Sequence, residues 1–176
     1  GLQGFEKLVY ASGGAHVEGA LLTETLLQVS GARVIKKEVA LSVSDDGYQI
    51  AGESYDQVIL ATGAWLGQIL EPLGYQVDVR PQKGQLRDYQ LDLDTADYPV
   101  VMPEGELDII PFQNGKISMG ATHENEMGFD LTVDQVLLNQ MEEEALTYYP
   151  ELAQAKVIGE RVGTRAYTSD FSPFWG

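Results

Sequence analysis

The spacing of apolar residues in the first part of the chain predicts one helix followed by short strands. Leu22, Leu26 and Val29 recur at helical spacing and predict a helix over residues 19–30. Gly31 then fits the left-handed position that often follows a helix end. Short apolar runs separated by turn residues predict strands at 33–35, 39–43 and 48–50.

Residues 58–65 read V-I-L-A-T-G-A-W and form the most informative octet of the chain. Four apolar residues in a row are typical of a strand buried on both faces. The small residues that follow permit a close approach by a ligand or by another backbone. The octet is therefore either a core strand that ends in a turn or a strand end beside a ligand. A short helix or coil is expected over 64–75, ended by Pro72 and Gly74.

The second half of the chain has the pattern of an antiparallel sheet. Residues 80–85, R-P-Q-K-G-Q, are interpreted as a junction that precedes this sheet. Asn114-Gly115 is a strong hairpin signal. Strands are predicted at 86–91, 100–102, 107–111, 116–122 and 156–165, and a turn at 168–170.

One amphipathic helix is expected between the last two of these strands. Thr132 and Gln135 have the spacing of a capping box, in which each side chain satisfies an unpaired backbone N–H group. The expected core-facing residues are Val136, Met141, Ala145, Leu146 and Tyr149. Glu142, Glu143 and Glu144 are assigned to the solvated face, and Pro150 ends the helix.

These elements predict an α+β fold. An antiparallel or mixed sheet with one amphipathic helix is attached to a partial α/β segment. The 176 residues are enough for one domain or slightly more, and no apolar run approaches the roughly 18 residues of a membrane span. The absence of Cys excludes disulfides and thiolate chemistry.

The net charge of −16 argues against nucleic-acid partners and anionic membranes, which both require clusters of Lys and Arg. Between Asp88 and Glu151 the only Lys or Arg is Lys116. This acidic stretch is either a solvated surface or a docking face for a basic partner.

Few residues in the chain are candidates for chemistry. There is no G-x-G dinucleotide loop and no phosphate-binding loop. His16 and His123 lack metal-ligand spacing, so both are expected to be structural or solvent-facing. Arg165 ends an apolar-rich strand in a chain poor in Arg. Its guanidinium either binds a substrate carboxylate as a bidentate fork or forms an internal ion pair.

Five motifs occur in an order that resembles a known family. They are G-G-A-H-V-E-G-A-L-L (13–22), V-I-L-A-T-G-A-W (58–65), R-P-Q-K-G-Q (80–85), I-I-P-F-Q-N-G-K-I-S-M-G-A-T-H-E (109–124) and G-T-R-A-Y-T-S-D-F-S-P-F-W-G (163–176). Together they resemble the D-amino-acid oxidase-type FAD-dependent oxidoreductases, nearest to the glycine oxidase and sarcosine oxidase-like branch. The resemblance covers the chain from about Ser12 onward.

The resemblance implies that the chain is an internal fragment of such an enzyme. The family's N-terminal unit with its G-x-G-x-x-G loop is absent from these residues. Residues 1–79 and 162–176 would belong to the FAD-binding domain, and residues 80–161 to the substrate-binding domain. The rest of the parent chain would complete the fold.

Site residues are implied only where the motifs match. Val39 corresponds to the contact with adenine, and Ala61, Thr62, Gly63 and Trp65 to the passage along the FAD. Arg165 corresponds to the residue that holds the substrate carboxylate.

Three departures from the family pattern bear on this site. Where the family usually has R-P, this chain has Arg165-Ala166. Asp108 stands where the family often has an aromatic residue, just before the I-I-P strand. No Cys is present for covalent flavin attachment. The first two weaken any assignment of glycine or an ordinary D-amino acid as the substrate.

The implied activity of the parent is oxidation of a small amine or amino acid by hydride transfer to FAD. The fragment alone is expected to be inactive and not to retain FAD. We assign no catalytic acid or base and no metal, and expect a cytoplasmic protein without nucleic-acid or membrane partners. Two alternatives remain: a non-catalytic acidic docking module, and a flavin dehydrogenase acting on a hydroxy acid or a polyol phosphate.

Overall fold

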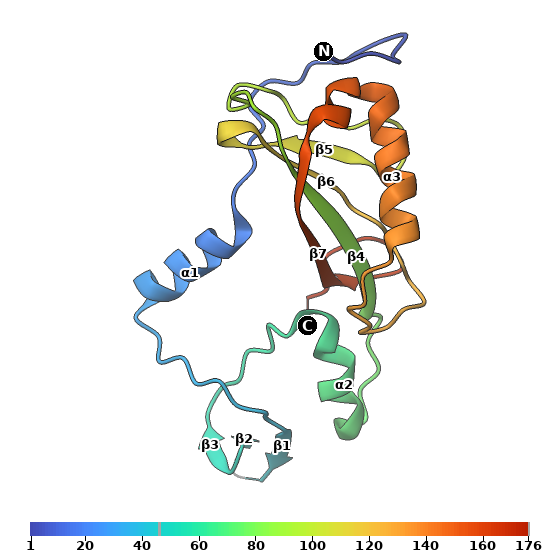
Figure 1. Cartoon of the computed structure of the whole chain (residues 1–176). Helices are drawn as coiled ribbons and strands as arrows, with labels where there is room; N and C mark the ends of the chain where they lie inside the picture. Colours follow the sequence, from blue (N-terminus) through green and yellow to red (C-terminus); the bar gives the residue numbers. More distant parts are fainter. Residues whose placement is uncertain (46, 176) are drawn as a thin grey trace. The chain divides into compact units, whose positions relative to one another are not determined.

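The computed structural model describes residues 1–45 and 47–175, and the chain forms two compact units (Figure 1). The small unit is Phe5–Tyr55. The main unit comprises Gly1–Gly4 and the residues from Asp56 onward. Each unit is described by itself below.

The small unit contains one helix and a three-stranded sheet. Helix α1 (Gly19–Ser30) ends at Gly31, whose φ of 63° confirms the predicted left-handed position. Strands β1 (Leu41–Ser44), β2 (Gly47–Ile50) and β3 (Glu53–Tyr55) pair antiparallel in the order β1-β2-β3. The helix prediction is confirmed. The predicted strand at 33–35 is not formed, and the strand predicted from residue 39 begins only at Leu41.

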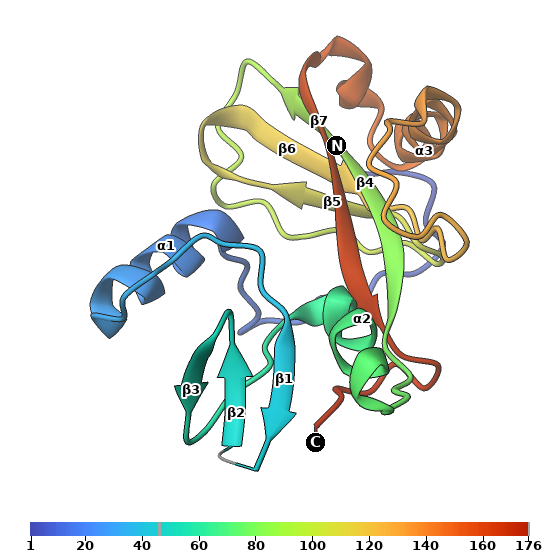
Figure 2. The ribbon, with the colours of Figure 1, turned by 90° about the horizontal axis from the view of Figure 1, so that it is seen from below.

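The main unit is built on a four-stranded antiparallel sheet. Its strands are β4 (Arg80–Gln90), β5 (Asp108–Pro111), β6 (Lys116–Gly120) and β7 (Lys156–Tyr167), in the order β5-β6-β4-β7. Figures 1 and 2 show β4 and β7 as the two longest strands, lying side by side. The predicted α+β class, with an antiparallel sheet and one amphipathic helix, is confirmed.

The hairpin between β5 and β6 has the predicted turn. Asn114 and Gly115 both have positive φ, 58° and 77°. A Cβ atom at position 115 would lie 2.2 Å from the carbonyl oxygen of Leu91, so only glycine fits there. Of the strand predicted at 100–102, only Val101 pairs, in an isolated bridge to Ile109.

The interpretation of residues 80–85 as a junction is wrong, because β4 already begins at Arg80. The pairing with β7 runs from Arg80 opposite Tyr167 to Gln90 opposite Lys156. Polar residues made this segment resemble a loop. Gln82, Lys83 and Gln85 are buried, but each has hydrogen-bond partners, so the polar strand is accommodated in the interior.

The strand predicted at 58–61 is also not formed. Ile59 is 91% exposed, and no strand of the described residues pairs with this segment. A strand buried on both faces requires neighbouring strands and cover on each side, and the described chain supplies neither here. The short helical stretch that follows is confirmed. It consists of η1 (Gly63–Trp65), α2 (Leu66–Leu70) and η2 (Glu71–Leu73), and ends at Gly74 with φ of 84°.

Helix α3 (Gln135–Tyr148) covers one face of the main sheet and closes the core. The buried core residues are Tyr89, Leu91, Leu107, Ile109, Ile117, Met119, Leu138, Met141, Ala145, Tyr149 and Leu152. Met141, Ala145 and Tyr149 were predicted correctly. Val136 is 65% exposed, contrary to prediction, and Leu138 takes its place in the core. Pro150 ends the helix as predicted and begins η4 (Pro150–Gln154).

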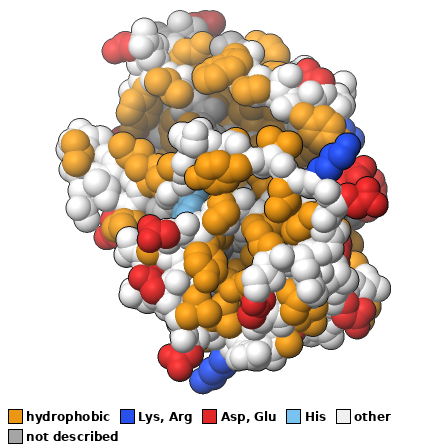
Figure 3. All heavy atoms as spheres, turned by 90° about the horizontal axis from the view of Figure 1, so that it is seen from above, with side chains coloured by type: hydrophobic (Ala, Val, Ile, Leu, Met, Phe, Trp, Pro, Cys, Tyr) orange, Lys and Arg blue, Asp and Glu red, His pale blue; other side chains and the backbone are white. Residues whose placement is uncertain are grey.

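Every helix of the described residues is too short or too polar to cross a lipid bilayer. Large apolar side chains are nevertheless exposed in both units, for example Leu26 and Ile59. Figure 3 shows hydrophobic side chains gathered on the face it presents, where Lys and Arg are sparse.

The cap of α3 differs from the predicted capping box. The carboxylate of Asp134, not the hydroxyl of Thr132, accepts the unpaired N–H groups of Val136 and Leu137, at 2.9 and 3.2 Å. The Thr132 N–H instead donates to Asp130. Thr132 therefore belongs to the turn that leads into the helix.

Replacing Asp134 tests this assignment. Asp134→Ala removes the cap acceptor and should lower the free energy of unfolding by about 1 kcal/mol, measured by urea denaturation. Asp134→Asn keeps an acceptor oxygen and should stay within a few tenths of a kcal/mol of the wild type. An equal loss in both variants would show that charge, and not the cap, is responsible.

Candidate functional site

Arg165 lies on the face of the main sheet that α3 does not cover. Side chains alternate between the two faces of a strand. Tyr89 and Met119 point toward α3 and belong to the core. Arg165 of β7 pairs with Gln82 of β4, and their side chains are hydrogen-bonded on the opposite face. We call this second surface the open face.

Two residues of β4 and one residue of the segment that follows β6 surround the Arg165 guanidinium. Its Nη1 donates to Gln82 Oε1 at 2.5 Å, and its Nη2 donates to the Thr122 carbonyl oxygen at 3.1 Å. Gly84 lies directly beneath it: a Cβ atom there would stand 2.6 Å from Nη2 and 2.9 Å from Cζ. The missing side chain of Gly84 therefore allows the guanidinium to lie against the strand.

The partners of Arg165 are neutral. Burial lowers the pKa of the Arg165 guanidinium, and the nearby Glu106 carboxylate opposes that shift. An arginine in a protein stays protonated in spite of such shifts. Two of the five N–H groups have acceptors among the described residues, so a half-buried cation retains capacity to bind an anion.

Arg161, four residues earlier on the same strand, shows the contrasting arrangement. It donates to both carboxylate oxygens of Asp88, at 2.8 and 3.0 Å, and to Ser118. Burial raises the pKa of Asp88, but hydrogen bonds from Arg161 and Ser118 outweigh it and lower the pKa overall. Arg161 therefore forms an ion pair within the chain, which is one of the two alternatives that the sequence left open for Arg165. No such pair is described at Arg165.

A buried lysine on the α3 side holds the segment that supplies Thr122. The Lys83 side chain is 2% exposed, and its Nζ lies 3.2 Å from Asp130 and 3.7 Å from Glu124. The backbones of Lys83 and Glu124 also exchange two hydrogen bonds. Lys83 therefore fixes the chain after β6 against β4, next to the guanidinium.

The residues expected along the FAD fall in two places. Thr62, Gly63 and Trp65 belong to the main unit, where η1 packs against β4 and β7. The Thr62 hydroxyl is buried and has no hydrogen-bond partner among the residues that the structure describes. Ala61 and Gly63 are exposed, and the Trp65 ring stacks on Phe129 at 4.8 Å. An unpaired hydroxyl beside exposed backbone fits a polar ligand passing this turn.

Val39 lies in the small unit, 49% exposed, just before β1. The other candidate site residues all belong to the main unit. His16 is exposed. His123 is 36% exposed, and its Nδ1 lies 3.2 Å from Glu106. The described residues contain no group of three or more side chains suited to a metal ion.

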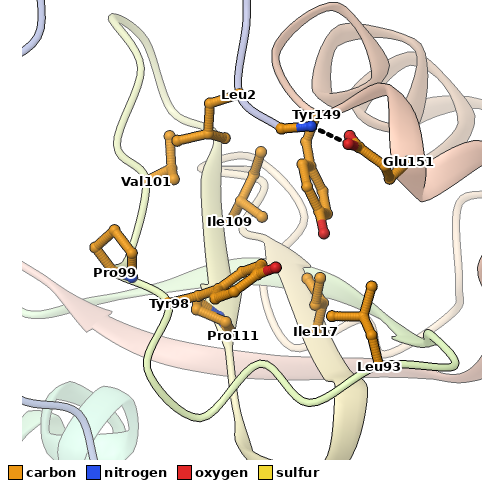
Figure 4. Close-up of a pocket in the computed structure, with 11 residues that line it drawn as sticks. Leu2, Leu93, Tyr98, Pro99, Val101, Ile109, Pro111, Ile117, Tyr149 and Glu151 are labelled. Atoms are coloured by element: carbon orange, nitrogen blue, oxygen red, sulfur yellow. Dashed lines mark hydrogen bonds and ion pairs between the residues drawn. The ribbon is translucent and has the colours of Figure 1, made fainter.

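A separate cavity of about 300 Å³ opens on the α3 side of the sheet (Figure 4). Ile109 and Ile117 form its floor, and Tyr98 and Tyr149 flank it. Since these isoleucines belong to the face opposite Arg165, the cavity is distinct from the open face. Its lining contains none of the site residues predicted from the sequence.

The partners of Arg165 were missed in the sequence. Gln82 and Gly84 belong to the R-P-Q-K-G-Q motif, which is part of the family resemblance but whose polar composition suggests a junction and not a strand. A correct assignment of this motif to a strand would have placed Gln82 and Gly84 on one face by their spacing of two. Thr122 contributes a backbone carbonyl, for which the sequence has no signal.

Comparison with known proteins identifies the family. Residues 1–176 match the family described as FAD dependent oxidoreductase. The chain belongs to this family. It is 39% identical over 186 residues to the uncharacterized oxidoreductase YurR of Bacillus subtilis, covering 98% of this chain and 49% of YurR. It is 30% identical to a glycine oxidase of Pseudomonas aeruginosa, covering 98% of this chain and 50% of that protein.

Solved structures agree with this assignment. The iminodiacetate oxidase of Chelativorans sp. BNC1 superposes with a TM-score of 0.81 at 34% identity, over 86% of this chain and 43% of that one. A glycine oxidase of Geobacillus kaustophilus shares the fold, with a TM-score of 0.72 at 23% identity, over 79% of this chain and 38% of that one. The chain spans about half the length of the curated relatives it matches. Family membership favours the oxidoreductase hypothesis over the acidic docking module.

The ion pair between Lys83 and Asp130 should make the stability of the fold depend on pH in the acid range. Hydrogen bonds from the Thr132 side chain and backbone, and then from Lys83, lower the pKa of Asp130 from 3.8 to about 2. A carboxyl group with a lowered pKa stabilises the fold above its ordinary pKa and loses that contribution as the pH falls. Asp130→Asn should therefore be less stable than wild type at neutral pH, and the difference should shrink below about pH 4.

Urea midpoints measured from about pH 6 to about pH 3 would follow this difference. Glu143→Gln removes an exposed charge from α3 and is the control for a general charge effect. A difference between Asp130→Asn and wild type that stayed constant over this pH range would contradict the assignment.

Proposed function

We propose that the parent protein is an FAD-dependent oxidoreductase that oxidises a small amine or amino acid, with the substrate carboxylate bound by Arg165. The observation that supports this proposal is the half-buried Arg165 cation on the open face, whose hydrogen-bond acceptors among the described residues, Gln82 and the Thr122 carbonyl, are both neutral. A carboxylate would supply the missing negative charge. The planar guanidinium can donate two parallel hydrogen bonds to it, which fixes both position and orientation.

The arrangement favours binding by Arg165 over Arg161. Asp88 already occupies the Arg161 fork with both carboxylate oxygens, so an incoming anion would have to displace it. Among the described residues, no carboxylate is hydrogen-bonded to Arg165. Because Gly84 has no side chain, the guanidinium can lie directly against the strand.

FAD would be held by Val39 in the small unit and by Ala61, Thr62, Gly63 and Trp65 in the main unit. The unpaired Thr62 hydroxyl and the exposure of Ala61 and Gly63 beside it support this assignment. The chemistry that FAD would supply there is the acceptance of a hydride from the carbon next to the substrate amine. The contribution of this chain is to orient that carbon, since a substrate fixed at its carboxylate has little freedom to turn away.

We further infer that residues 1–79 and 162–176 form part of the FAD-binding domain, with residues 80–161 as the substrate-binding domain. The prediction of a cytoplasmic protein also remains part of this proposal.

The relatives suggest the substrates to test first. Proteins similar to this chain are named as oxidases of glycine and of iminodiacetate, and both compounds carry a carboxylate next to an amine. The full-length protein should be purified and inspected for the visible absorption of oxidised flavin, then assayed with both compounds. Hydrogen peroxide release would favour an oxidase. Electron transfer only to a dye or quinone would favour a dehydrogenase. If a hydroxy acid or polyol phosphate reduces the flavin and the amines do not, the substrate class proposed here is wrong and those compounds are the substrates.

Arg165→Ala in the full-length enzyme tests the proposed anchor. Loss of a bidentate charged contact costs on the order of 2–5 kcal/mol, so KM or the Kd of a carboxylate inhibitor should rise about 30-fold or more. Arg165→Lys should restore only part of the affinity, because an ammonium group cannot fork. Flavin content should remain near wild type, and the melting temperature should fall only modestly, because Gln82 Oε1 loses one hydrogen bond.

Steady-state kinetics and a thermal melt on the same variants decide the matter. An unchanged KM together with unchanged inhibitor binding would remove Arg165 from the substrate site. A lower melting temperature with wild-type affinity would assign Arg165 a structural role instead.

A further inference from the structure

Gln82 is a buried amide that connects two polar side chains on the open face. Its side chain is largely enclosed, and the residue is 5% exposed. Its Nε2 donates to Asn125 Oδ1 at 2.7 Å, while its Oε1 accepts from Arg165 Nη1 at 2.5 Å. A chain of hydrogen bonds therefore connects Asn125, Gln82 and Arg165.

The chemistry of these groups fixes the direction of the Gln82 amide. A guanidinium can only donate hydrogen bonds, so the amide must turn its oxygen toward Arg165. Its NH2 group then points away and requires an acceptor, which Asn125 Oδ1 provides. The reverse orientation would leave donors facing donors in a buried site, at the cost of an unsatisfied hydrogen bond.

We propose that Gln82 is a positioning residue, which holds the Arg165 guanidinium against Gly84 so that its unoccupied N–H groups face the substrate carboxylate. This inference rests on the proposed role of Arg165. Thr122 supplies the second fixed point through its backbone carbonyl oxygen. Since Lys83 pairs with Glu124, the segment that carries both Thr122 and Asn125 is held on β4.

The neutrality of Gln82 is part of this role. A carboxylate at position 82 would also accept from Arg165, but it would neutralise the cation, as Asp88 does for Arg161. An amide orients the guanidinium and leaves its charge for the substrate. The two requirements, orientation and uncompensated charge, can therefore be separated by two substitutions at one position.

The experiment uses the full-length, flavin-loaded enzyme with glycolate as the probe carboxylate. If glycolate bleaches the flavin, the enzyme oxidises hydroxy acids, and acetate replaces glycolate as the probe in every measurement below. The Kd of glycolate is measured from the change in flavin absorbance. Gln82→Leu removes the acceptor and should weaken glycolate binding about 10-fold, the size expected for a hydrogen bond to a charged group. Gln82→Glu should also weaken binding, although its melting temperature stays at or above that of Gln82→Leu.

Two controls separate positioning from general damage. Gln90→Leu makes the same change at the other end of β4, where the amide bonds to the carbonyl oxygens of Leu91 and Asn114, and it should leave glycolate binding unchanged. In the Arg165→Ala background, adding Gln82→Leu should weaken binding no further, because Gln82 acts only through Arg165.

Wild-type glycolate affinity in Gln82→Leu, or a full additional loss in the double variant, would overturn the inference. If Arg165→Ala binds glycolate as wild type does, or wild type does not bind it, the proposed function fails instead. A crystal structure of Gln82→Leu then decides the positioning role alone: a guanidinium displaced from Gly84 supports it, and an unmoved guanidinium refutes it.

Discussion

The antiparallel pairing of β4 with β7 is the constraint on which the site depends. It continues from Arg80 opposite Tyr167 to Gln90 opposite Lys156, with one irregularity between Asp88 and Tyr89. Register decides which side chains meet, and a shift of one residue would move Arg165 to the α3 face. Glu160 of β7, which accepts from the buried Arg87 on that face, opposes such a shift because the shift would break this ion pair.

The two faces of β4 therefore have different functions within a single strand. On the α3 side, Lys83 is buried with its carboxylate partners and fixes the chain that follows β6. On the open face, Gln82 and Gly84 shape the surroundings of Arg165. Breaking a buried ion pair costs several kcal/mol, so substitution at Lys83 would disturb the site through the fold, whereas Gln82 acts on it directly.

The sequence predicts those parts of this molecule whose signals are local. Helix α1, the Asn114-Gly115 hairpin and the stop at Pro150 each depend on a few adjacent residues, and each was predicted. The strand at 58–61 was predicted from apolar content, but a buried strand depends on partners elsewhere in the chain. The start of β4 was missed for the converse reason, because its polar residues are compensated by partners at distant positions, such as Asn125 for Gln82.

The same distinction explains what could be predicted of the candidate site. Arg165 was identified from its motif and its position at a strand end, but the choice between an ion pair and a carboxylate anchor depends on which groups lie across the sheet. The two arginines of β7 show this, because they share one strand and one face. Arg161 meets the carboxylate of Asp88, whereas Arg165 meets an amide and a backbone carbonyl. The charge of the group that each guanidinium meets, and not the arginine itself, therefore determines whether the cation is neutralised within the chain.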